Sequence, residues 1–453
     1  MLGPLENVLI EMERRGLLID PAYFKKQAIE ADSRAEHIIL ELNEWTLQEG
    51  AGVINWRSVD QKQSFFHQHL YLPTSPVCGK GKTKKDKDPT DNKALEWFRD
   101  HCRQKGRKTH ARYFEKAIEL QKCFSASKYL NKFPLHADSD NYVHCNMAPD
   151  TKTFRLAARC PELQQVPIRK EKDLYHIRKG FISPEGMDYI VADQSQLEMR
   201  ILGHLLLKMF GDDSLIKDIL DSDCHSKNVI KVYGRVYPDK YVLHPGTGGQ
   251  VLFADLPPEF IKDHPDVWVS GKRDTIKNIA YGLIYGLTIY RLAFDLKDDF
   301  GEPIGKEAAT VIYNMYLDLY PGLRKLMAFC KEFVIKNGGM YDLLGGFLPI
   351  PDSQSSDGWK IESAARMAMN TPMQRGAAKL MALAMLLIEN CPLLKKLGCT
   401  QRVQIHDEID FYCPEQNSDE AMPIIQNHME TALELLCPLK AKPGKGKSWY
   451  DAK

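Results

Sequence analysis

Residues 402–412 read RVQIHDEIDFY, and this stretch decides the fold. Valine and isoleucine alternate with polar residues before the triplet HDE, and isoleucine and phenylalanine alternate with acidic or aromatic residues after it. Alternation with a period of two is typical of half-buried strands, so we expect a β-hairpin near 400–413. The turn of that hairpin would hold His406, Asp407 and Glu408.

A second stretch, MDYIVADQ at 187–194, is a compact apolar run with an acid near its end. It predicts a buried strand that carries Asp193 at its polar tip, followed by a helix over 195–207. A carboxylate in that place is costly unless it is paired or holds a metal. Asp193 and Asp407 would together suit a pair of Mg²⁺ ions about 4 Å apart. These residues alone leave open a structural ion pair as the alternative.

A third stretch, RDTIKNIAYGLIYG at 273–286, predicts a strong helix. Arg273, Lys277 and Tyr281 recur at every fourth position, so they share one face of it. A face with two cations and an aromatic ring can hold a triphosphate and stack a base, although a solvated basic stripe is the plainer alternative. Each of the two glycines in this helix costs about 1 kcal/mol, which suggests that something approaches the backbone closely.

Charge and composition limit the classes of function. The 453 residues carry a formal net charge of +1, so no overall field points to a polyanion, although local patches can exist. The 11 cysteines form no CxxC pair, which predicts reduced structural thiols. No signal core is present, and no apolar run approaches the roughly 20 residues that cross a bilayer. We therefore expect a soluble, cytoplasmic protein with no membrane partner.

The rest of the chain is expected to be mainly helical. A basic stretch, GKGKTKKDK at 79–87, is either a solvated loop or a flexible arm that grips phosphates. Thr90 or Asp91 would cap the helix that follows it. Short strand-like pieces are expected over 138–160, and a long connection over 235–269. Further helices are expected in the first 50 residues and over 92–98, 106–135, 271–285, 305–337 and 359–390.

Taken together, the three quoted stretches resemble the signature motifs of family A DNA polymerases, the DNA polymerase I type. DQSQLEMR at 193–200 looks like D-Y-S-Q-I-E-L-R, and QIHDE at 404–408 looks like Q-V-H-D-E. RDTIKNIAYGLIYG matches R-x-x-x-K-x-x-x-F/Y-G-x-x-Y-G. The three motifs occur in the family's order and at suitable spacing.

The resemblance covers nearly the whole chain. TFRL at 153–156 followed by PELQ at 161–164 looks like T-G-R-L-S-S-x-x-P-N-L-Q, and DCH at 223–225 resembles D-I-H. Two further groups match R-x-x-x-N-x-P-x-Q and G-x-G-x-x-W, namely Arg366, Asn370, Pro372 and Gln374, and Gly444, Gly446 and Trp449. The chain departs from the family pattern at Phe154, Ala157, Ala158, Gln194, Gly346 and Phe347 and in the length of 235–269.

This resemblance implies an α+β fold of the right-hand polymerase type, with a palm of antiparallel strands and a helical thumb and fingers. The expected segments are the palm entry at 1–24, the thumb at 25–135, the palm with the first metal-binding motif at 136–204, the fingers at 205–340, and the palm with the second metal-binding motif and the C-terminus at 341–453.

The implied activity is template-directed, DNA-dependent DNA synthesis, in which deoxynucleotides are added to a primer 3′-hydroxyl by two-metal-ion phosphoryl transfer. Asp193 and Asp407 would ligate both Mg²⁺ ions, for which Mn²⁺ can substitute. Glu408 would be an assisting acid. Lys277 would contact the triphosphate and protonate the leaving pyrophosphate.

The resemblance also implies how nucleotides are selected. Glu198 would fill the space that a 2′-hydroxyl needs, and Tyr281 would stack on the incoming nucleotide. The tyrosine form of position 281 is associated with poor rejection of dideoxynucleotides, so we expect efficient dideoxy incorporation. The expected nucleotide-binding residues are Gln196, Glu198, His225, Arg273, Lys277, Tyr281 and Tyr285.

Contacts to DNA follow from the same motifs. Arg155, Gln374 and His406 would read minor-groove acceptor atoms that all correct base pairs share. Arg366 and Asn370 would position the template. The expected DNA-binding residues are Arg155, Gln164, Arg366, Asn370, Gln374 and His406.

The expected partners are primer-template DNA and dNTPs, bound by a monomer. Because the resemblance begins almost at residue 1, we expect no proofreading or 5′ nuclease domain in this chain. The chain would either work beside a separate exonuclease or processivity factor, or be an excised fragment. A phage origin is slightly favoured. Two alternatives remain, a single-subunit RNA polymerase-like enzyme, against which Glu198 and the HDE triplet argue, and a catalytically silent primer-template binding protein.

Overall fold

A four-stranded antiparallel sheet forms the centre of the molecule. In the computed structural model, which describes residues 2–75, 89–167, 173–221, 223–296 and 304–453, its order is β10-β11-β5-β12. The strand predicted over 187–194 is confirmed residue for residue, and the hairpin predicted near 400–413 is also confirmed. The strand bounds are Met187–Gln194 for β5, Thr400–Ile405 for β10, Glu408–Pro414 for β11 and Ala441–Gly446 for β12.

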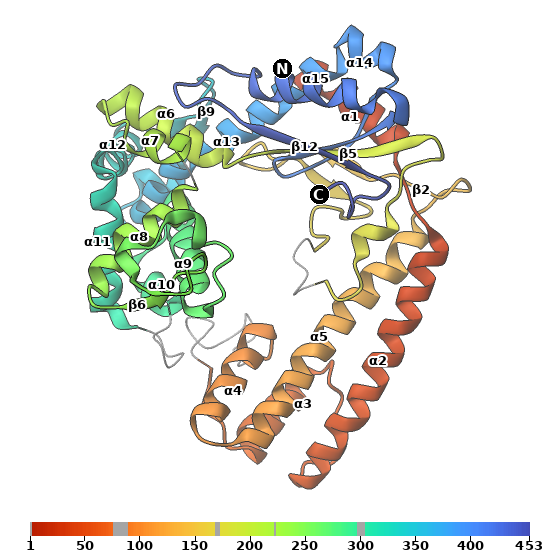
Figure 1. Cartoon of the computed structure of the whole chain (residues 1–453), viewed down its shortest axis with the longest axis vertical. Helices are drawn as coiled ribbons and strands as arrows, with labels where there is room; N and C mark the ends of the chain where they lie inside the picture. Colours follow the sequence, from red (N-terminus) through yellow and green to blue (C-terminus); the bar gives the residue numbers. More distant parts are fainter. Residues whose placement is uncertain (1, 76–88, 168–172, 222, 297–303) are drawn as a thin grey trace.

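Helices cover the sheet and bury its apolar run. Residues 189–192 of β5 are buried, as expected for a central strand with both neighbours paired. Helices α1, α13 and α15 pack against the sheet strands (Figure 1). Their bounds are Leu2–Arg15 for α1, Gly358–Glu389 for α13 and Ser418–Glu430 for α15, and α14 (Pro392–Leu397) precedes β10.

A lobe of long helices extends away from the sheet (Figure 1). Asp20 caps the first of them, and Asp91, one of the two residues predicted for that role, caps α4 by accepting a hydrogen bond of 3.0 Å from the Ala94 amide. The basic stretch at 79–87 lies outside the described residues. The lobe holds α2 (Pro21–Gln48), α3 (Val59–Ser64), α4 (Asn92–Gln104) and α5 (Lys108–Leu135).

A second helical lobe lies on the other side of the space below the sheet (Figure 1). The helix predicted over 195–207 begins at Leu197 instead, because Gln196 has a left-handed backbone with φ of +54°. The lobe holds α6 (Leu197–Phe210), α7 (Ser214–Asp221), α8 (Cys224–Val236), α9 (Val267–Ile284), α10 (Ile289–Asp295), α11 (Gly305–Leu319) and α12 (Pro321–Asn337).

The long connection predicted over 235–269 is more structured than expected. It contains the hairpin of β6 (Tyr241–Leu243) and β7 (Gln250–Leu252) and two short 3-10 turns, Phe253–Asp255 and Pro258–Phe260. Helix α9 also starts before the predicted residue 271, because the Asp266 side chain caps it by accepting a hydrogen bond of 2.8 Å from the Trp268 amide.

Besides the β6–β7 hairpin, the described residues form three other two-stranded sheets. Each is too short to form an independent layer. The pairs are β1 (Leu17–Leu18) with β2 (Tyr142–Val143), β3 (Asn146–Ala148) with β4 (Ala157–Arg159), and β8 (Gly339–Tyr341) with β9 (Phe347–Pro349).

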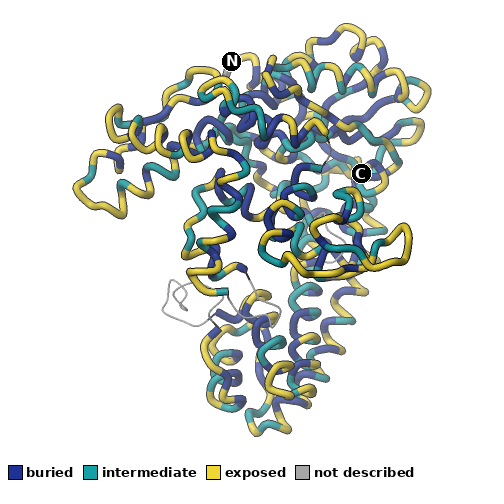
Figure 2. The backbone as a smooth tube through the Cα atoms, turned by 60° about the vertical axis from the view of Figure 1, so that its left-hand side comes forward, coloured by how far each residue is buried: buried dark blue, intermediate teal, exposed yellow. Residues whose placement is uncertain are grey.

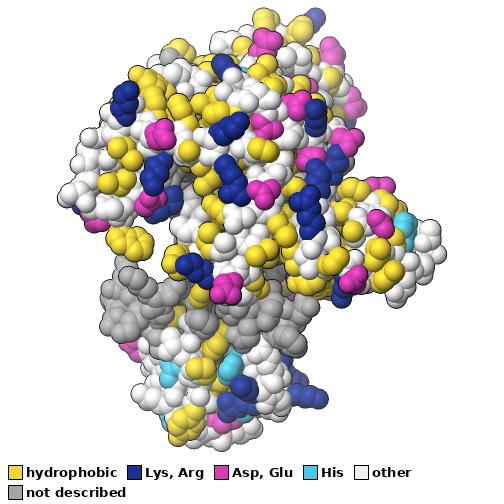
Figure 3. Space-filling view, turned by 90° about the vertical axis from the view of Figure 1, so that its left-hand side faces the viewer, with side chains coloured by type: hydrophobic (Ala, Val, Ile, Leu, Met, Phe, Trp, Pro, Cys, Tyr) yellow, Lys and Arg dark blue, Asp and Glu magenta, His cyan; other side chains and the backbone are white. Residues whose placement is uncertain are grey.

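Burial and surface charge agree with this layout. Figure 2 shows the buried stretches running through the sheet and along the inner faces of the helices. On the face shown in Figure 3, Lys and Arg side chains are interspersed with Asp and Glu, in keeping with the net charge of +1. Within the described ranges, no helix has both the length and the apolar character that a membrane crossing requires.

Candidate active site

Backbone pairing brings the two predicted metal-binding aspartates to one edge of the sheet. Glu408 is the register partner of Asp193, and the Gln194 amide donates a hydrogen bond of 2.9 Å to the Asp407 carbonyl. Asp407 is the second residue of a two-residue turn whose first residue, His406, has φ of +58°. The turn therefore fixes Asp407 beside the end of β5 without help from a ligand.

The electrostatics of this edge favour a bound cation. Burial raises the pKa of Asp407 to about 7, with Glu198 and Asp193 adding to the rise and Arg155 opposing it. Partial burial also raises the pKa of Asp193, which Lys453 opposes and Glu408 reinforces. The protein thus gathers more negative charge here than it neutralises, and a divalent cation would relieve the excess.

The donor set fits Mg²⁺ held partly by a substrate. Among the described residues, no three or more His, Cys, Asp or Glu side chains are grouped as a closed metal site. Mg²⁺ is commonly bound by one or two carboxylates together with substrate phosphates, so two aspartates are enough.

Glu408 differs sharply from its neighbour Asp407. It is only 2% exposed, and Trp449 Nε1 donates a hydrogen bond of 2.7 Å to its Oε1 atom. Arg178 Nη1 lies 3.4 Å from the same oxygen, while Lys453 donates to Oε2. Burial opposes ionisation, but Lys453 and Arg178 outweigh it, and the pKa of Glu408 is lowered. Both oxygens of Glu408 are engaged by the protein itself.

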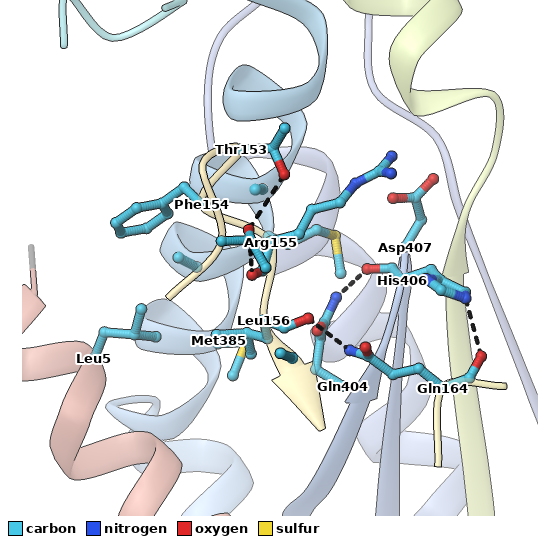
Figure 4. A pocket seen from close by; sticks show the side chains of 15 residues that line it. Leu5, Thr153, Phe154, Arg155, Leu156, Gln164, Met385, Gln404, His406 and Asp407 are labelled. Atoms are coloured by element: carbon cyan, nitrogen blue, oxygen red, sulfur yellow. Dashed lines mark hydrogen bonds between the residues drawn. The ribbon is translucent and has the colours of Figure 1, made fainter. Parts of the chain in front are cut away.

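A cavity of about 240 Å³ opens beside Asp407 (Figure 4). Arg155 extends its guanidinium toward Asp407, and the backbone carbonyl of Gln164 lies 3.1 Å from His406 Nε2. Gln164 Nε2 donates a hydrogen bond of 2.9 Å to the Leu156 carbonyl. Three predicted DNA-binding residues therefore line one cavity next to the acidic edge.

Arg155, Glu198 and Tyr285 form a tight cluster above the aspartates. Arg155 Nη2 lies 2.5 Å from Glu198 Oε1, and the Tyr285 hydroxyl donates to Glu198 Oε2 at 2.5 Å. Tyr285 directly follows α9, so this hydrogen bond joins the end of α9 to the first turn of α6. Both carboxylate oxygens of Glu198 are thereby held in place.

The predicted face of α9 is turned toward this cluster. The apolar residues Ile276, Leu283 and Ile284 of α9 are buried. The pKa of Tyr281 is raised by burial and then by Glu198, with Asp407 also contributing. Tyr281 therefore lies near enough to Glu198 and Asp407 for their charges to act on its hydroxyl.

The two glycines singled out in the sequence are explained by their neighbours, and only Gly282 lies within α9, because the helix ends at Ile284. A Cβ atom on Gly282 would lie 2.8 Å from the Leu287 side chain. Gly286 has φ of +77°, and a Cβ atom there would lie 2.5 Å from the Arg366 side chain. The close approach that the sequence suggested is made by the protein's own side chains.

Arg273 and His225 meet where α8 begins. Arg273 Nε and Nη2 each lie 2.7 Å from Asp223 Oδ2, so this guanidinium is paired within the protein. The His225 ring lies 5.7 Å from the Tyr281 ring, and neither of its buried nitrogens has a hydrogen-bond partner in the described part of the chain. Burial lowers the pKa of His225 to about 4, so the imidazole is neutral at pH 7. Two buried nitrogens without hydrogen-bond partners among the described residues, close to the cations Arg273 and Lys277, indicate a site for an anionic ligand.

The remaining predicted residues lie on α13 and before α6. Arg366, Asn370 and Gln374 recur at every fourth position and share one face of α13. The buried Asn370 Oδ1 atom finds no hydrogen-bond partner among the described residues. Gln196 Oε1 accepts a weak hydrogen bond of 3.4 Å from the Cys224 thiol.

Sequence reasoning missed three residues that organise this site. Asp223 pairs with Arg273, Arg178 stacks on Trp449 with 3.7 Å between the guanidinium carbon and the ring centroid, and Lys453 contacts two acids. Asp223 belongs to the DCH motif at 223–225, and Trp449, the partner of Arg178, ends the G-x-G-x-x-W motif. No local pattern marks Arg178 or Lys453, because their partners lie more than 40 residues away in the chain.

Comparisons with known proteins agree with the motifs. The family model described as DNA polymerase family A matches residues 23–240 and 249–451. DNA polymerase I of Deinococcus radiodurans is 29% identical over 457 residues, covering 100% of this chain and 42% of that protein. The thermostable DNA polymerase I of Thermus aquaticus is 28% identical over 456 residues, covering 99% of this chain and 48% of that protein. The chain thus spans about half the length of these relatives.

A solved structure shares the fold. The polymerase domain of Pol1 from M. smegmatis, in complex with DNA primer-template and dNTP, superposes with a TM-score of 0.82 at 26% identity. The match covers 100% of this chain and 70% of that one, and confirms the predicted α+β right-hand fold. The relatives named here are bacterial and lend no support to a phage origin. The chain belongs to DNA polymerase family A.

Proposed function

We propose that this chain is a template-directed DNA polymerase that adds deoxynucleotides to a primer 3′-hydroxyl. One observation carries the proposal: Asp193 and Asp407 lie at one edge of the sheet, and Glu198, which acts on Asp407, is hydrogen-bonded to Tyr285 directly after α9. The similar M. smegmatis polymerase domain, bound to primer-template and dNTP, supports the assignment of both partners.

Asp193 and Asp407 would hold two Mg²⁺ ions, with Mn²⁺ as a substitute. Burial, reinforced by the charges of Glu198 and Asp193, raises the pKa of Asp407, and a bound cation would stabilise its ionised form, which supports this role. Bound metal would lower the pKa of the primer 3′-hydroxyl and neutralise charge on the leaving group. Glu408, whose oxygens are already engaged, supports the turn that carries Asp407 instead of taking part directly.

The chain's own groups would bind the triphosphate and move one proton. The primer 3′-hydroxyl would lose its proton to solvent as its oxygen attacks the α-phosphorus, and the bond between that phosphorus and the oxygen that bridges to the β-phosphate would break. Arg273, Lys277 and the neutral His225 imidazole would bind the phosphates, and Lys277 would give its proton to the departing pyrophosphate. Phosphate binding would require Arg273 to exchange at least part of its contact with Asp223.

Nucleotide choice would depend on the cluster around Glu198. Its carboxylate is fixed by Arg155 and Tyr285, so it can exclude a 2′-hydroxyl without moving. Tyr281 would stack on the incoming base, and its hydroxyl would serve in place of a missing 3′-hydroxyl. Gln196, held at the start of α6, would lie beside the nucleotide.

Primer-template DNA would bind across the cavity beside Asp407. Arg155, Gln374 and His406 would read minor-groove acceptors, with Gln164 supporting His406. Arg366 and Asn370 on α13 would position the template. In the right-hand layout, residues 25–135 would be the thumb, 205–340 the fingers, and 1–24, 136–204 and 341–453 the palm.

Other expectations remain predictions. They are the monomeric state, a place at DNA in the cytoplasm, and a separate exonuclease or processivity factor. The RNA polymerase-like alternative requires a site that accepts a 2′-hydroxyl, whereas Glu198 is fixed by two hydrogen-bonding partners. The catalytically silent alternative gives no reason for an acidic edge with unneutralised charge.

Primer extension tests the proposal. A labelled primer on a DNA template is incubated with Mg²⁺ and either dNTPs or NTPs, using wild type and Asp407→Ala. We expect extension with dNTPs only, directed by the template base and lost in the variant. Extension with NTPs at a similar rate would favour the RNA polymerase-like enzyme. Binding of primer-template without any extension by wild type would favour the silent binding protein.

A further inference from the structure

Lys453 brings a positive charge to the acidic edge of the sheet. Its Nζ atom donates a hydrogen bond to Glu408 Oε2 and lies 3.7 Å from Asp193 Oδ2. The Lys453 side chain is 29% exposed, whereas that of Glu408 is 3% exposed. One ammonium group thus bridges a buried acid and a metal-binding candidate.

The bridge is part of a larger set of donors. Trp449 donates to the other oxygen of Glu408, and Arg178 stacks on Trp449 while approaching the same oxygen. Residues after β12 therefore close over the β10–β11 turn and hold the Glu408 carboxylate from both sides. With both oxygens occupied, Glu408 cannot turn toward a cation beside Asp407 unless Lys453 releases it.

The position of Lys453 relative to Asp193 separates two explanations. A purely structural lysine would compensate Glu408, and its loss would leave a buried acid unpaired and loosen the site. A lysine that also acts on Asp193 repels any divalent cation bound there, because like charges a few ångströms apart oppose each other even when partly solvated. The two explanations predict opposite changes in metal affinity when the charge is removed.

We propose that Lys453 is a positioning residue that acts as a resident counter-cation of the acidic edge. It keeps Glu408 out of the metal site and weakens divalent-cation binding by Asp193 and Asp407. This inference rests on the proposed metal-binding role of those two aspartates. It explains why three neighbouring acids are tolerated before a nucleotide brings metal with it.

Removing the charge should therefore tighten metal binding. In Lys453→Met, Mn²⁺ would bind roughly three- to tenfold more tightly at low ionic strength, because repulsion is lost and Glu408 becomes an additional oxygen donor. The difference should shrink at high salt, since screening weakens the contribution of a partly exposed charge.

Electron paramagnetic resonance of Mn²⁺ titrated into the protein alone measures the Mn²⁺ affinity without relying on turnover. The variants are Lys453→Met, Lys453→Arg, which retains the charge, and Asp407→Asn. Lys447→Met is the matched control, because Lys447 pairs with Asp188 and Glu415 at the opposite end of β5. We expect tighter binding only in Lys453→Met, near wild-type affinity in Lys453→Arg and Lys447→Met, and weaker binding in Asp407→Asn.

Three outcomes would overturn the inference, and they are distinguishable. Weaker or unchanged Mn²⁺ binding in folded Lys453→Met would show that the lysine has only a structural role. Equal tightening in Lys447→Met would show a general charge effect. Wild-type binding that is unaffected by Asp407→Asn would overturn both this inference and the proposed metal site. Circular dichroism of each variant checks that the fold is retained.

Discussion

The acidic edge of the sheet and the cationic face of α9 present opposite charges and are held in place differently. Asp193 and Asp407 are fixed by strand pairing, and their surplus charge is left without full compensation. On the other side, Arg273 is already neutralised by Asp223, while the buried His225 nitrogens lack partners among the described residues. The acidic edge is therefore suited to bind a cation directly, whereas α9 can bind an anionic ligand through Arg273 only by exchanging the Arg273–Asp223 ion pair.

This difference also separates two adjacent acids. Asp407 and Glu408 are neighbours in the chain, yet the pKa of one is raised and that of the other is lowered. The cause is the direction in which each side chain leaves the strand end, since one faces Glu198 and the other meets Trp449 and Lys453. Asp407 and Glu408 thus differ in role, although they are adjacent in one motif.

The largest expected effect comes from removing a metal-binding acid. Asp193→Asn or Asp407→Asn should lower the rate of single-turnover primer extension by roughly a thousandfold or more, because transition-state charge loses its stabilisation. Glu408→Gln should cost less, since its partners are protein donors. Asp419→Asn, which removes an exposed partner of Lys445, is the control. Equal losses of rate in all four variants would contradict the distinction between the two metal-binding aspartates and Glu408.

The helix side should affect nucleotide binding. Arg273→Ala should weaken dNTP affinity roughly 10- to 100-fold, because a charge-assisted contact to phosphate is lost. The concentration dependence of single-turnover rates gives that affinity. Lys331→Ala, which removes an exposed ion pair with Glu362 on α13, should leave it unchanged. An unchanged dNTP affinity in Arg273→Ala would remove this residue from the site.

A smaller effect is expected at Tyr281. Tyr281→Phe should reduce incorporation of dideoxynucleotides relative to dNTPs by roughly tenfold, because one hydroxyl contact is lost. Competition between ddNTP and dNTP on one template measures the ratio. If the ratio is the same in wild type and variant, the hydroxyl has no part in accepting dideoxynucleotides.

The smallest expected effect is a dependence on pH. Burial raises the pKa of Asp407 from 3.8 to about 7. Protonation of Asp407 therefore stabilises the metal-free fold fully below pH 3.8, and this contribution is lost as the pH rises through about 7. Mn²⁺ requires the deprotonated acid, so its affinity should rise over the same window, roughly twofold between pH 7 and 8. Thermal unfolding with and without Mn²⁺ measures the trend, which Asp407→Asn should abolish.

Local patterns were predictable from the sequence. The apolar run at 187–194 and the alternation around 402–412 identified β5 and the hairpin, since period and turn chemistry act over a few residues. The four-residue spacing on α9 likewise identified its cationic face. Asp91, Gly282 and Gly286 could be interpreted because capping and close backbone approach limit the residue type.

Long-range pairs were not predictable. Lys453 and Arg178 reach Glu408 from 45 and 230 residues away, and nothing near either residue indicates that partner. The extent of structure in 235–269 was also missed, because its strands are only three residues long and flanked by proline and glycine. Such contacts depend on how the layers pack, which a single sequence does not display.

The most direct test of the account is a count of bound metal ions. Mn²⁺ would be titrated into a complex of the protein with primer-template and a non-hydrolysable dNTP analogue, using wild type, Asp193→Asn and Asp407→Asn. We expect two tightly bound ions in wild type, with at least one lost in each variant. Full occupancy in both variants would contradict the claim that Asp193 and Asp407 hold the metal ions.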